Sequence, residues 1–424
     1  MTERLYQSNV YLKECMSTIL AISEESCLIL DRSPFFPISG GQPCDLGTIN
    51  DIQLSEVFEK DGELYHKFSI SGSRSATSPQ TEDPKVLPFR IGDTVICRLD
   101  WERRFDHMQR HCGEHILSGV FFRDFGGVNR GFHMGSDYMT IDIDLPAVTI
   151  DMAHRAELSA NEVIWSDAPV SIRYFQSREE AERLPLRKGI SIEKDISIVC
   201  VGDEASLIDC VACCGTHPKT AGQIGLIKLL KIEKYKGMSR IYFEAGKRAF
   251  LKTVKEHKLI ATLAEKYSAD ENTLTVKISA QEEKNQLVRQ DLQKYQVLLI
   301  EREVQSLIEA ISFPGEDSPG CRQVIVKEYD RLNLEDLQLL AKGISALSPN
   351  IFILISIEEK ALLISRANQS NSSSPDCGGL IKSNVGDFKG KGGGSPLNGR
   401  ASFQSSADLD DFVLHVVGLM IDEI

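Results

Sequence analysis

Short hydrophobic runs alternate with turn-forming clusters over the first 90 residues. Runs such as Val10–Leu12, Cys27–Leu30 and Leu64–Phe68 are three to five residues long, and glycine, proline, serine and aspartate separate them. Short runs between turn residues are typical of β-strands. The pattern therefore predicts a β-rich domain over residues 1–90, in which the polar stretch 71–85 is an exposed loop.

Helical and alternating patterns are mixed between residues 91 and 245. Leu117, Val120 and Phe121 have helical spacing and predict a helix over residues 101–122. A second helix is expected near residues 152–165. Strands are expected near residues 138–145, 170–175 and 196–201, and a β-hairpin at 222–243 with Gly237 at its turn.

The segment 246–314 is predicted to be helical. Ser268 and Glu271 have the spacing of a capping box, which divides the segment into two helices. Pro314 and Gly315 are expected to end the second helix. That helix carries apolar residues three or four positions apart, and such a seam indicates a helical hairpin or a dimer contact. The seam residues are Leu274, Ile278, Val288, Leu292, Tyr295 and Leu299.

Residues 315–424 alternate between strand and helix patterns. Strands are expected at 323–327, 351–357 and 361–366, with a helix at 334–347. A glycine-rich loop and a final helix follow, and this order predicts a small α/β domain. The predicted fold class of the whole chain is α+β.

Length and composition restrict the class of protein. The chain has 424 residues, of which 42% are hydrophobic and 26% charged, which excludes a disordered, collagen-like or purely coiled-coil protein. Neither a membrane-spanning stretch nor an export signal is recognised, so a cytoplasmic protein with reduced cysteines is expected. The net charge of −13 excludes a generally basic nucleic-acid binder, but it leaves a local basic face possible.

Three histidines, His107, His111 and His115, are four residues apart in the helix predicted over 101–122. Two histidines at this spacing lie on one helix face and can reach one ion. His107 and His115 are separated by about 12 Å of helix rise, so the three cannot share a metal. Either adjacent pair remains possible.

Cys213 and His217 repeat the four-residue spacing farther along the chain. Together with a histidine pair they supply three nitrogens and one thiolate, a donor set that suits Zn²⁺ better than Mg²⁺ or Ca²⁺. Cys112, Cys210 and Cys214 are competing thiolate ligands. The alternative is that the histidines are surface groups and the cysteines are small buried side chains.

These motifs resemble a known family. Met108–His115 and Cys213–His217 are similar to the metal motifs of the alanyl-tRNA synthetase editing domain, and still more to those of the freestanding alanyl-tRNA editing proteins, often called AlaX. The segment Pro34–Gly47 resembles the family signature Gly-Gly-Gln-x-x-Asp-x-Gly. Gly390–Pro396 resembles the glycine-rich motif of the C-terminal domain in long AlaX forms and in DHH-type phosphoesterases. The resemblance thus spans nearly the whole chain.

The resemblance implies a fold of four parts and an activity. The parts are a small β-barrel (1–90), a zinc-containing editing domain (91–245), a helical linker or coiled coil (246–314) and an α/β domain for tRNA binding and dimerisation (315–424). The implied activity is hydrolysis of Ser-tRNA(Ala), and also of Gly-tRNA(Ala), by a homodimer. A ligase role is not expected, because no room remains for an aminoacylation domain. The implied Zn²⁺ ligands are His111, His115, Cys213 and His217.

Gln42, His133 and Thr216 are the candidate catalytic residues. Gln42 belongs to the Gly-Gly-Gln signature and is expected near the tRNA terminus. His133 stands where related editing domains carry glutamine in Gln-x-Gly-Ser, so it contacts substrate or is a core histidine. Thr216 is a candidate partner for the seryl hydroxyl, although such a threonine more often bonds backbone. Glu114 is a weaker general-base candidate, for which a solvated carboxylate is the favoured interpretation.

A basic stretch follows the cysteine motif. Residues 223–256 contain nine lysines and arginines and three acids, which indicates a strip facing phosphates or a solvated face. Two alternative functions remain, a tRNA-binding module with structural zinc and a metal-dependent phosphoesterase. The second is weak because no Asp-His-His cluster is present. The candidate tRNA-binding residues are Lys228, Lys231, Lys234, Lys236, Arg240, Lys389, Lys391 and Arg400.

Overall fold

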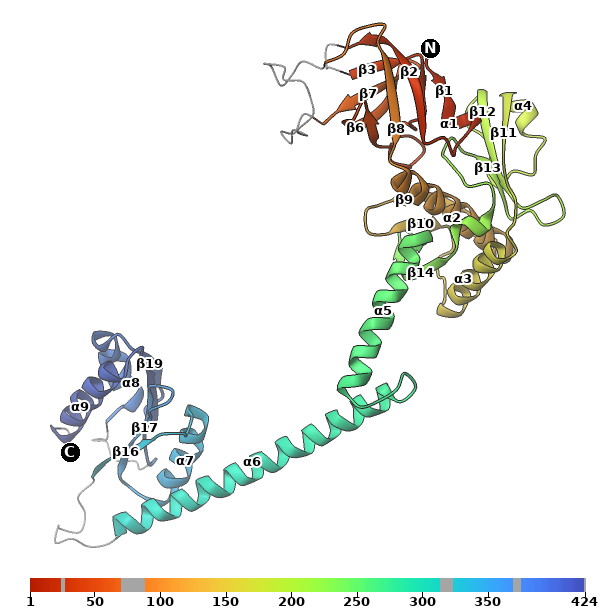
Figure 1. The fold of residues 1–424 in the computed structure, drawn as a ribbon. Coiled ribbons are helices and arrows are strands. Elements are labelled where there is room, and N and C mark those ends of the chain that lie inside the picture. Colours follow the sequence, from red (N-terminus) through yellow and green to blue (C-terminus); the bar gives the residue numbers. More distant parts are fainter. Residues whose placement is uncertain (24–26, 70–87, 313–322, 369–374, 423–424) are drawn as a thin grey trace. The chain divides into compact units, whose positions relative to one another are not determined.

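The computed structural model describes residues 1–23, 27–69, 88–312, 323–368 and 375–422. These residues form two compact units, Met1–Leu263 and Ala264–Ile424 (Figure 1). The loop predicted at 71–85 and the stop signal at Pro314 and Gly315 lie outside the described residues. The division of the chain into four domains, at residues 90, 245 and 314, remains a prediction.

The first unit begins with a closed six-stranded barrel, in the order β2-β3-β7-β6-β5-β8. Alternate strand residues such as Ile19, Leu28, Val57 and Val95 fill its interior. The barrel extends past residue 90, because β8 closes it by pairing with both β2 and β5 and so leaves no free edge. Its strands are β2 (Glu14–Ile22), β3 (Cys27–Leu30), β5 (Gly47–Ile49), β6 (Ile52–Lys60), β7 (Glu63–Phe68) and β8 (Thr94–Leu99). Beside it lie β1 (Glu3–Arg4), α1 (Leu5–Ser8) and β4 (Arg32–Ser33).

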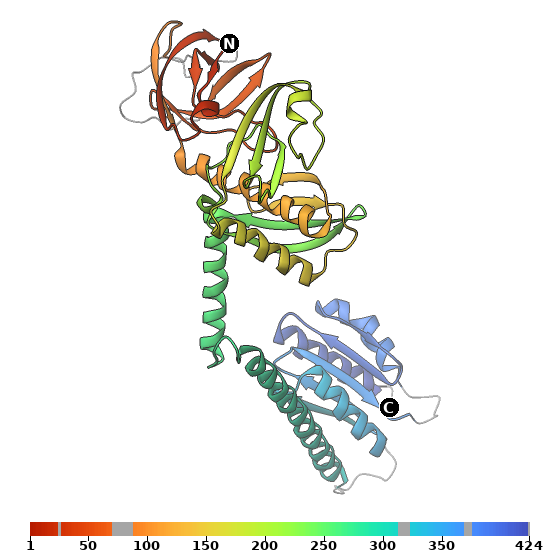
Figure 2. The ribbon, with the colours of Figure 1, turned by 90° about the vertical axis from the view of Figure 1, so that its right-hand side faces the viewer.

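Two helices cover one face of an antiparallel sheet in the order β14-β15-β10-β9 (Figure 2). The Asp100 side chain caps the first helix by accepting from the Arg103 N–H, and Gly126 ends that helix at φ +69°. Ile116, Ile141 and Phe243 belong to the core between the layers. The elements are α2 (Trp101–Phe125), β9 (Asn129–Met134), β10 (Met139–Ile143), α3 (Ile150–Trp165), β14 (Ile227–Tyr235) and β15 (Met238–Ala245).

A smaller three-stranded sheet, in the order β11-β12-β13, completes the first unit. The strands predicted near 170–175 and 196–201 are confirmed. The predicted hairpin is also confirmed, with Gly237 at φ +79°, but it begins only at Ile227 because a short 3₁₀-helix precedes it. The elements are β11 (Val170–Ser177), α4 (Arg178–Ala181), β12 (Lys194–Val201), β13 (Asp209–Ala212) and η1 (Ala221–Ile224).

Two long helices, α5 (Gly246–Lys266) and α6 (Leu274–Ser312), follow. The division between them is confirmed, but the capping box predicted at Ser268 is wrong. Asp270 takes that role, because its Oδ1 accepts hydrogen bonds from the N–H groups of Asn272 and Thr273, both at 2.9 Å. None of the helices in the described ranges has the length and apolar character needed to cross a membrane.

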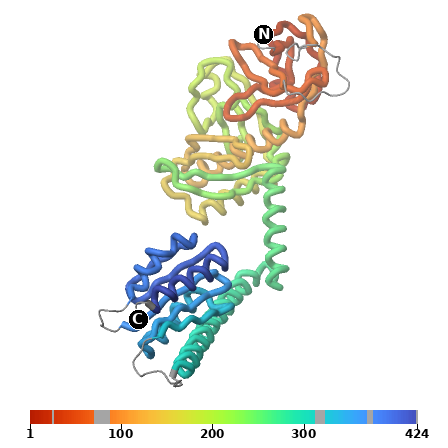
Figure 3. The backbone as a smooth tube through the Cα atoms, turned by 90° about the vertical axis from the view of Figure 1, so that its left-hand side faces the viewer, coloured from red at the N-terminus to blue at the C-terminus, as the bar shows by residue number. Residues whose placement is uncertain are grey.

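The second unit is a five-stranded sheet with helices on both faces (Figure 3). The last turns of α6 and helix α7 pack on one face, and α8 and α9 pack on the other. The strand order is β16-β17-β18-β20-β19, in which only the pair β16 and β17 is parallel. The elements are β16 (Val324–Tyr329), α7 (Leu334–Leu347), β17 (Ile351–Ser356), β18 (Ala361–Arg366), α8 (Cys377–Asn384), η2 (Val385–Phe388), β19 (Lys391–Gly394), β20 (Asn398–Ser402) and α9 (Ser406–Asp422).

The glycine-rich segment is a strand, so its prediction as a loop is wrong. Glycine is required because β19 runs very close to neighbouring backbone. A Cβ atom on Gly392 would lie 2.4 Å from the Arg400 carbonyl oxygen, and one on Gly394 would lie 2.1 Å from the Asn398 carbonyl oxygen.

Helix α6 buries only part of its apolar surface within the second unit. Ile300, Val304 and Leu307 pack against α7, and the sequence pattern did not single them out. Leu274 is buried, but the predicted seam residues Val288, Leu292, Tyr295 and Leu299 are 50–67% exposed. The dimer contact predicted from this seam remains a prediction.

Candidate metal centre

Four side chains from two segments converge inside the first unit. Helix α2 supplies His111 and His115, and the loop directly after β13 supplies Cys213 and His217. Their ligand atoms all lie within 4.8 Å of one another. The Cys213 Sγ is 3.4 Å from the His111 Nε2 and 3.7 Å from the His217 Nε2. The sequence-predicted ligands are therefore assembled at one point.

The cluster has the properties of a cation site. The His115 Nε2 is buried and has no hydrogen-bond partner among the described residues. Tetrahedral zinc sites have bonds of about 2.0–2.3 Å, which place ligand atoms roughly 3.3–3.8 Å apart. Burial alone would raise the pKa of the Cys213 thiol, but the neighbouring imidazoles of His111, His217 and His115 lower that pKa well below its usual value. The thiolate needed for metal binding is thus favoured.

The alternative ligands lie elsewhere. His107 is a buried histidine outside the cluster, and burial together with nearby arginines lowers its pKa to about 3. Cys112 belongs to the hydrophobic core, and the Cys214 Sγ lies 3.2 Å from the Ser39 Oγ. Cys210 forms a disulfide with Cys200, directly opposite it on β12, so the expectation of reduced cysteines is wrong for this pair.

Gln42 holds two parts of the centre together. Its Oε1 is 2.8 Å from the His111 Nδ1 and accepts from the Thr216 N–H at 3.1 Å. Its Nε2 donates to the Thr216 Oγ1 at 2.8 Å. Because the Gln42 side chain is fully buried and its amide is engaged at both ends, it fixes the orientation of the His111 ring and of the Thr216 hydroxyl. A direct role of Gln42 or Thr216 in catalysis remains a prediction.

The aspartate of the Gly-Gly-Gln-x-x-Asp-x-Gly signature also connects the barrel to helix α2. Asp45 forms a fully buried ion pair with Arg104, whose Nη1 and Nη2 donate to the Val10 and Pro34 carbonyls at 2.9 and 2.7 Å. The Asp45 Oδ2 also accepts from the Phe36 N–H at 2.6 Å. The pairing of Asp45 with Arg104 was not anticipated, since no local spacing links a loop residue to one 59 positions later.

His115 has its own orienting group, which the sequence interpretation missed. The Asp209 Oδ2 lies 2.8 Å from the His115 Nδ1, and the Asp209 carboxylate is completely buried. A single acid at the start of the otherwise apolar strand β13 was the available signal. A buried charge in such a run indicates a specific partner.

Two further candidates lie outside the cluster of four ligands. Glu114 is buried, and its Oε1 accepts from the Ser118 Oγ at 2.6 Å and the Asn129 Nδ2 at 2.8 Å, so the favoured interpretation as a solvated carboxylate is wrong. His133 is exposed on β9 and pairs in register with Thr140. Its contact with substrate remains a prediction.

The candidate tRNA-binding residues of the first unit are partly paired with acids. Lys228 contacts Glu157 at 2.7 Å and Arg240 contacts Asp142 at 2.7 Å, and Lys231 is paired with Glu233. Lys234 and Lys236 are exposed. These pairings reduce the positive potential that the sequence count alone indicates, and the role in tRNA binding remains a prediction.

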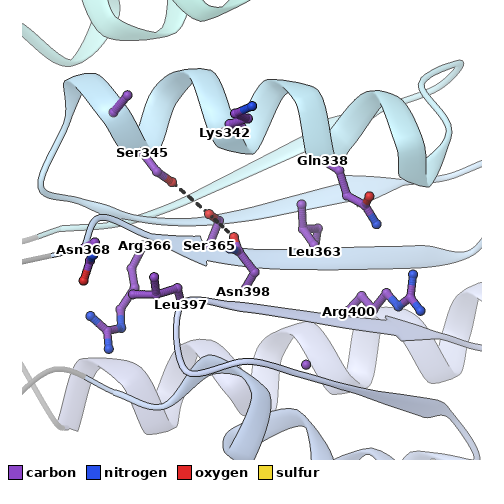
Figure 4. A pocket seen from close by; sticks show the side chains of 12 residues that line it. Gln338, Lys342, Ser345, Leu363, Ser365, Arg366, Asn368, Leu397, Asn398 and Arg400 are labelled. Carbon is purple, nitrogen blue, oxygen red and sulfur yellow. Dashed lines mark hydrogen bonds between the residues drawn. The ribbon is translucent and has the colours of Figure 1, made fainter.

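In the second unit, Arg400 is the candidate cation that lines an open cavity of about 630 Å³ between α7 and the strands β18 and β20 (Figure 4). Hydrogen bonds join Ser345 to Ser365 at 2.8 Å and Ser365 to Asn398 at 2.6 Å across its floor. Arg400 lines both this cavity and a neighbouring one that Lys391 borders. Lys389 lies 3.7 Å from the Asp408 carboxylate. Among the described residues, basic side chains and no acids line the two cavities.

Comparisons with known proteins agree with this geometry. Residues 196–242 match the family described as the threonyl and alanyl tRNA synthetase second additional domain, a stretch that includes Cys213 and His217. The chain is 36% identical over 261 residues to the alanyl-tRNA editing protein AlaX-L of Pyrococcus horikoshii, which covers 59% of this chain and 60% of that protein. It is 34% identical over 253 residues to AlaX-M of Methanosarcina acetivorans, covering 57% of this chain and 98% of that protein.

A third relative is the alanyl-tRNA editing protein Aarsd1 of Mus musculus, which is 33% identical over 222 residues. That match covers 52% of this chain and 49% of the mouse protein. The chain therefore spans 60% of the AlaX-L protein and about half of the mouse protein that it matches. The fold and site define a protein with a stretch similar to the synthetase second additional domain and a cluster of side chains that could hold a metal ion. The chain belongs to the family of alanyl-tRNA editing proteins.

Proposed function

We propose that this protein is a metal-dependent deacylase that hydrolyses Ser-tRNA(Ala), and also Gly-tRNA(Ala), in trans. The observation that carries the proposal is the cluster of the buried His111, His115 and His217 with the half-buried Cys213, in a chain whose relatives are named alanyl-tRNA editing proteins. The products are the free amino acid and tRNA(Ala). Hydrolysis of an activated ester requires that the carbonyl and a water be positioned and that the developing negative charge be tolerated.

Zn²⁺ is the proposed ion. Three imidazole nitrogens and one thiolate suit zinc, and the short distances between the donor atoms support a tetrahedral ion. The four named side chains would hold it. When bound with an exchangeable position, zinc supplies Lewis acidity that polarises a carbonyl or a water.

The chain's own residues position the reacting groups. Thr216 accepts a hydrogen bond from the Gln42 amide, and we propose that its hydroxyl hydrogen donates to the seryl hydroxyl of the substrate. Gln42 fixes both Thr216 and His111, so one amide sets the separation between the proposed specificity group and the metal ligand. His133 is proposed to contact the substrate from β9.

The tRNA itself is proposed to contact basic residues of both units. Exposed Lys234 and Lys236 in the first unit and the cations bordering the C-terminal cavities support this part of the proposal. The exposed apolar seam of α6 supports a homodimer formed through the helical region. A cytoplasmic location is also proposed, and cysteines that form no disulfide, such as Cys44, Cys112 and Cys377, support it.

A second candidate function is a tRNA-binding module with structural zinc. The observation that favours it is that all four ligands come from the protein, as in closed structural sites. Deacylation separates the two candidates. Purified protein is incubated with Ser-tRNA(Ala) with and without a chelator, and zinc is then added back.

The deacylase proposal expects release of serine that the chelator abolishes and zinc restores. The double variant Cys213→Ala/His217→Ala should lose both bound zinc and activity. Hydrolysis equal to the rate without protein, in a sample that contains one zinc per chain and binds tRNA, would support the structural-zinc alternative.

A further inference from the structure

Asp209 connects a metal-ligand histidine to a buried arginine. Its Oδ2 lies 2.8 Å from the His115 Nδ1. Its Oδ1 accepts from the Arg187 Nε at 2.5 Å, and its Oδ2 accepts from the Arg187 Nη2 at 3.2 Å. The Arg187 side chain is only 5% exposed, and the Asp209 side chain is not exposed at all. The three side chains therefore form a continuous buried chain that ends at the metal cluster.

Arg187 is held from both its backbone and its side chain. It lies between α4 and β12, and its N–H donates to the Cys210 carbonyl at 2.8 Å. The guanidinium reaches the carboxylate of the residue before Cys210, Asp209, on the same strand. Two hydrogen bonds from the planar Nε and Nη2 groups fix the plane of that carboxylate, which a single ammonium could not do.

The orientation of His115 depends on this carboxylate. A carboxylate that accepts from Nδ1–H selects the tautomer whose Nε2 carries the free lone pair. That Nε2 is buried and has no hydrogen-bond partner among the described residues, as expected for an atom that faces an ion. A buried carboxylate without a cation would be costly, and Arg187 provides the opposite charge.

We propose that Arg187 is a positioning residue for metal binding, acting through Asp209 on His115. The proposal rests on the metal centre and not on the deacylase activity. It assigns the segment between α4 and β12 a task at a site from which it contributes no ligand. The competing explanation is that the ion pair only fastens this segment to β13.

Metal affinity distinguishes these explanations. Full-length protein is stripped of metal, and its affinity for Zn²⁺ is measured by competition with a chromophoric chelator. Arg187→Gln is expected to weaken zinc binding about 10–100-fold, the usual effect of losing a group that orients a ligand. Arg187→Lys keeps the charge and should retain more affinity than Arg187→Gln. Arg183→Gln, an exposed arginine in the same segment, should bind zinc as the unaltered protein does.

A double-variant cycle tests whether Arg187 acts through Asp209. In the Asp209→Asn background, adding Arg187→Gln should cause little further loss of zinc affinity, because the connection is already broken. The absorption spectrum of the Co²⁺-loaded protein should change in Arg187→Gln and not in Arg183→Gln. Thermal unfolding of the metal-free variants measures any loss of fold separately.

The proposal is overturned if folded Arg187→Gln and Arg187→Lys both bind zinc normally with an unchanged cobalt spectrum. It is also overturned if the two losses simply add in the double variant. None of these measurements depends on deacylation. Failure of the proposed deacylase activity would therefore not decide whether Arg187 positions His115.

Discussion

Gln42 and His111 meet across the boundary between the barrel and helix α2, with 2.8 Å between Oε1 and Nδ1. They are 69 residues apart in sequence, and neither side chain has appreciable exposure. The metal centre is therefore not a property of helix α2 and the cysteine loop alone. The loop before β5 contributes the group that sets the orientation of the His111 ring.

Replacing Gln42 by alanine should weaken zinc binding about 10-fold or more, because His111 loses the acceptor that fixes its ring. Deacylation of Ser-tRNA(Ala) should fall as well, since Thr216 loses its partner. Chelator competition and initial rates measure the two effects. Gln7→Ala, at an exposed position, is the control. Unchanged zinc affinity in Gln42→Ala would contradict the orienting role.

Gly215 has no room for a side chain. A Cβ atom there would lie 2.2 Å from the His111 Cε1 and 2.9 Å from the Gln42 Oε1, so Gly215→Ala must displace one of them. We expect the variant to lose most of its bound zinc, measured by elemental analysis of the purified protein. Gly189→Ala, where nothing lies within 4 Å of the added atom, should retain the full amount. Full zinc content in Gly215→Ala would show that zinc binding does not depend on the close packing of Gly215 against His111.

The buried pair Asp45 and Arg104 should be important for stability. Arg104→Met leaves a carboxylate buried without its cation and is expected to lower the free energy of unfolding by about 3–5 kcal/mol. Arg98→Met removes an arginine that is 45% exposed and pairs with Glu14 and Asp51, and its effect on the free energy of unfolding should be much smaller, because solvent screens both ion pairs. Urea unfolding of both variants measures the difference. Equal losses of unfolding free energy in the two variants would contradict the stabilising role of the buried ion pair.

His66 should make the stability of the barrel depend on pH. Burial lowers its pKa to about 4, although the Leu28 carbonyl favours the charged form. Between about pH 6.5 and pH 4 the unfolded chain binds a proton that the folded chain does not, so stability is fully present above this window and falls as the pH is lowered through it. The full effect is about 3 kcal/mol.

Substituting His66 by phenylalanine should flatten the dependence of unfolding free energy on pH across this window, whatever its effect on absolute stability. His154→Gln, at an exposed histidine, should leave the slope unchanged. Urea titrations at several pH values provide the comparison. A slope that survives in His66→Phe would assign the dependence to other groups.

The predictable features of this protein were those with a local signal. The spacing of His111 and His115, and that of Cys213 and His217, is a local signal, but spacing alone leaves His107 and the competing cysteines open. The set of four side chains that the structure brings together is the one that the resemblance to alanyl-tRNA editing proteins implies. The hairpin around Gly237 and most strands are also predicted from signals within a few neighbouring residues. The partners Asp209 and Arg104 required knowledge of which distant segments touch, and no spacing encodes that.

The errors have similar physical causes. The sequence predicts a loop where strand β19 (Lys391–Gly394) lies, because glycine has low strand propensity, whereas close packing of neighbouring backbone requires glycine there. The angle of Glu114 on the helix predicts a solvated carboxylate, but this angle carries no information on Ser118 and Asn129, which donate hydrogen bonds to it. Ser268 matched a capping pattern, but Asp270 two residues later made the bonds.

Strand β8 ends at Leu99 and helix α2 starts at Trp101, with only Asp100 between them. The strand that closes the barrel therefore also determines where the histidine-bearing helix begins. A polypeptide that starts after residue 90 would keep every ligand, yet it would lack Gln42, Asp45 and five of the six barrel strands. Such a fragment should therefore be a poor zinc binder, and the two parts are best regarded as one inseparable body.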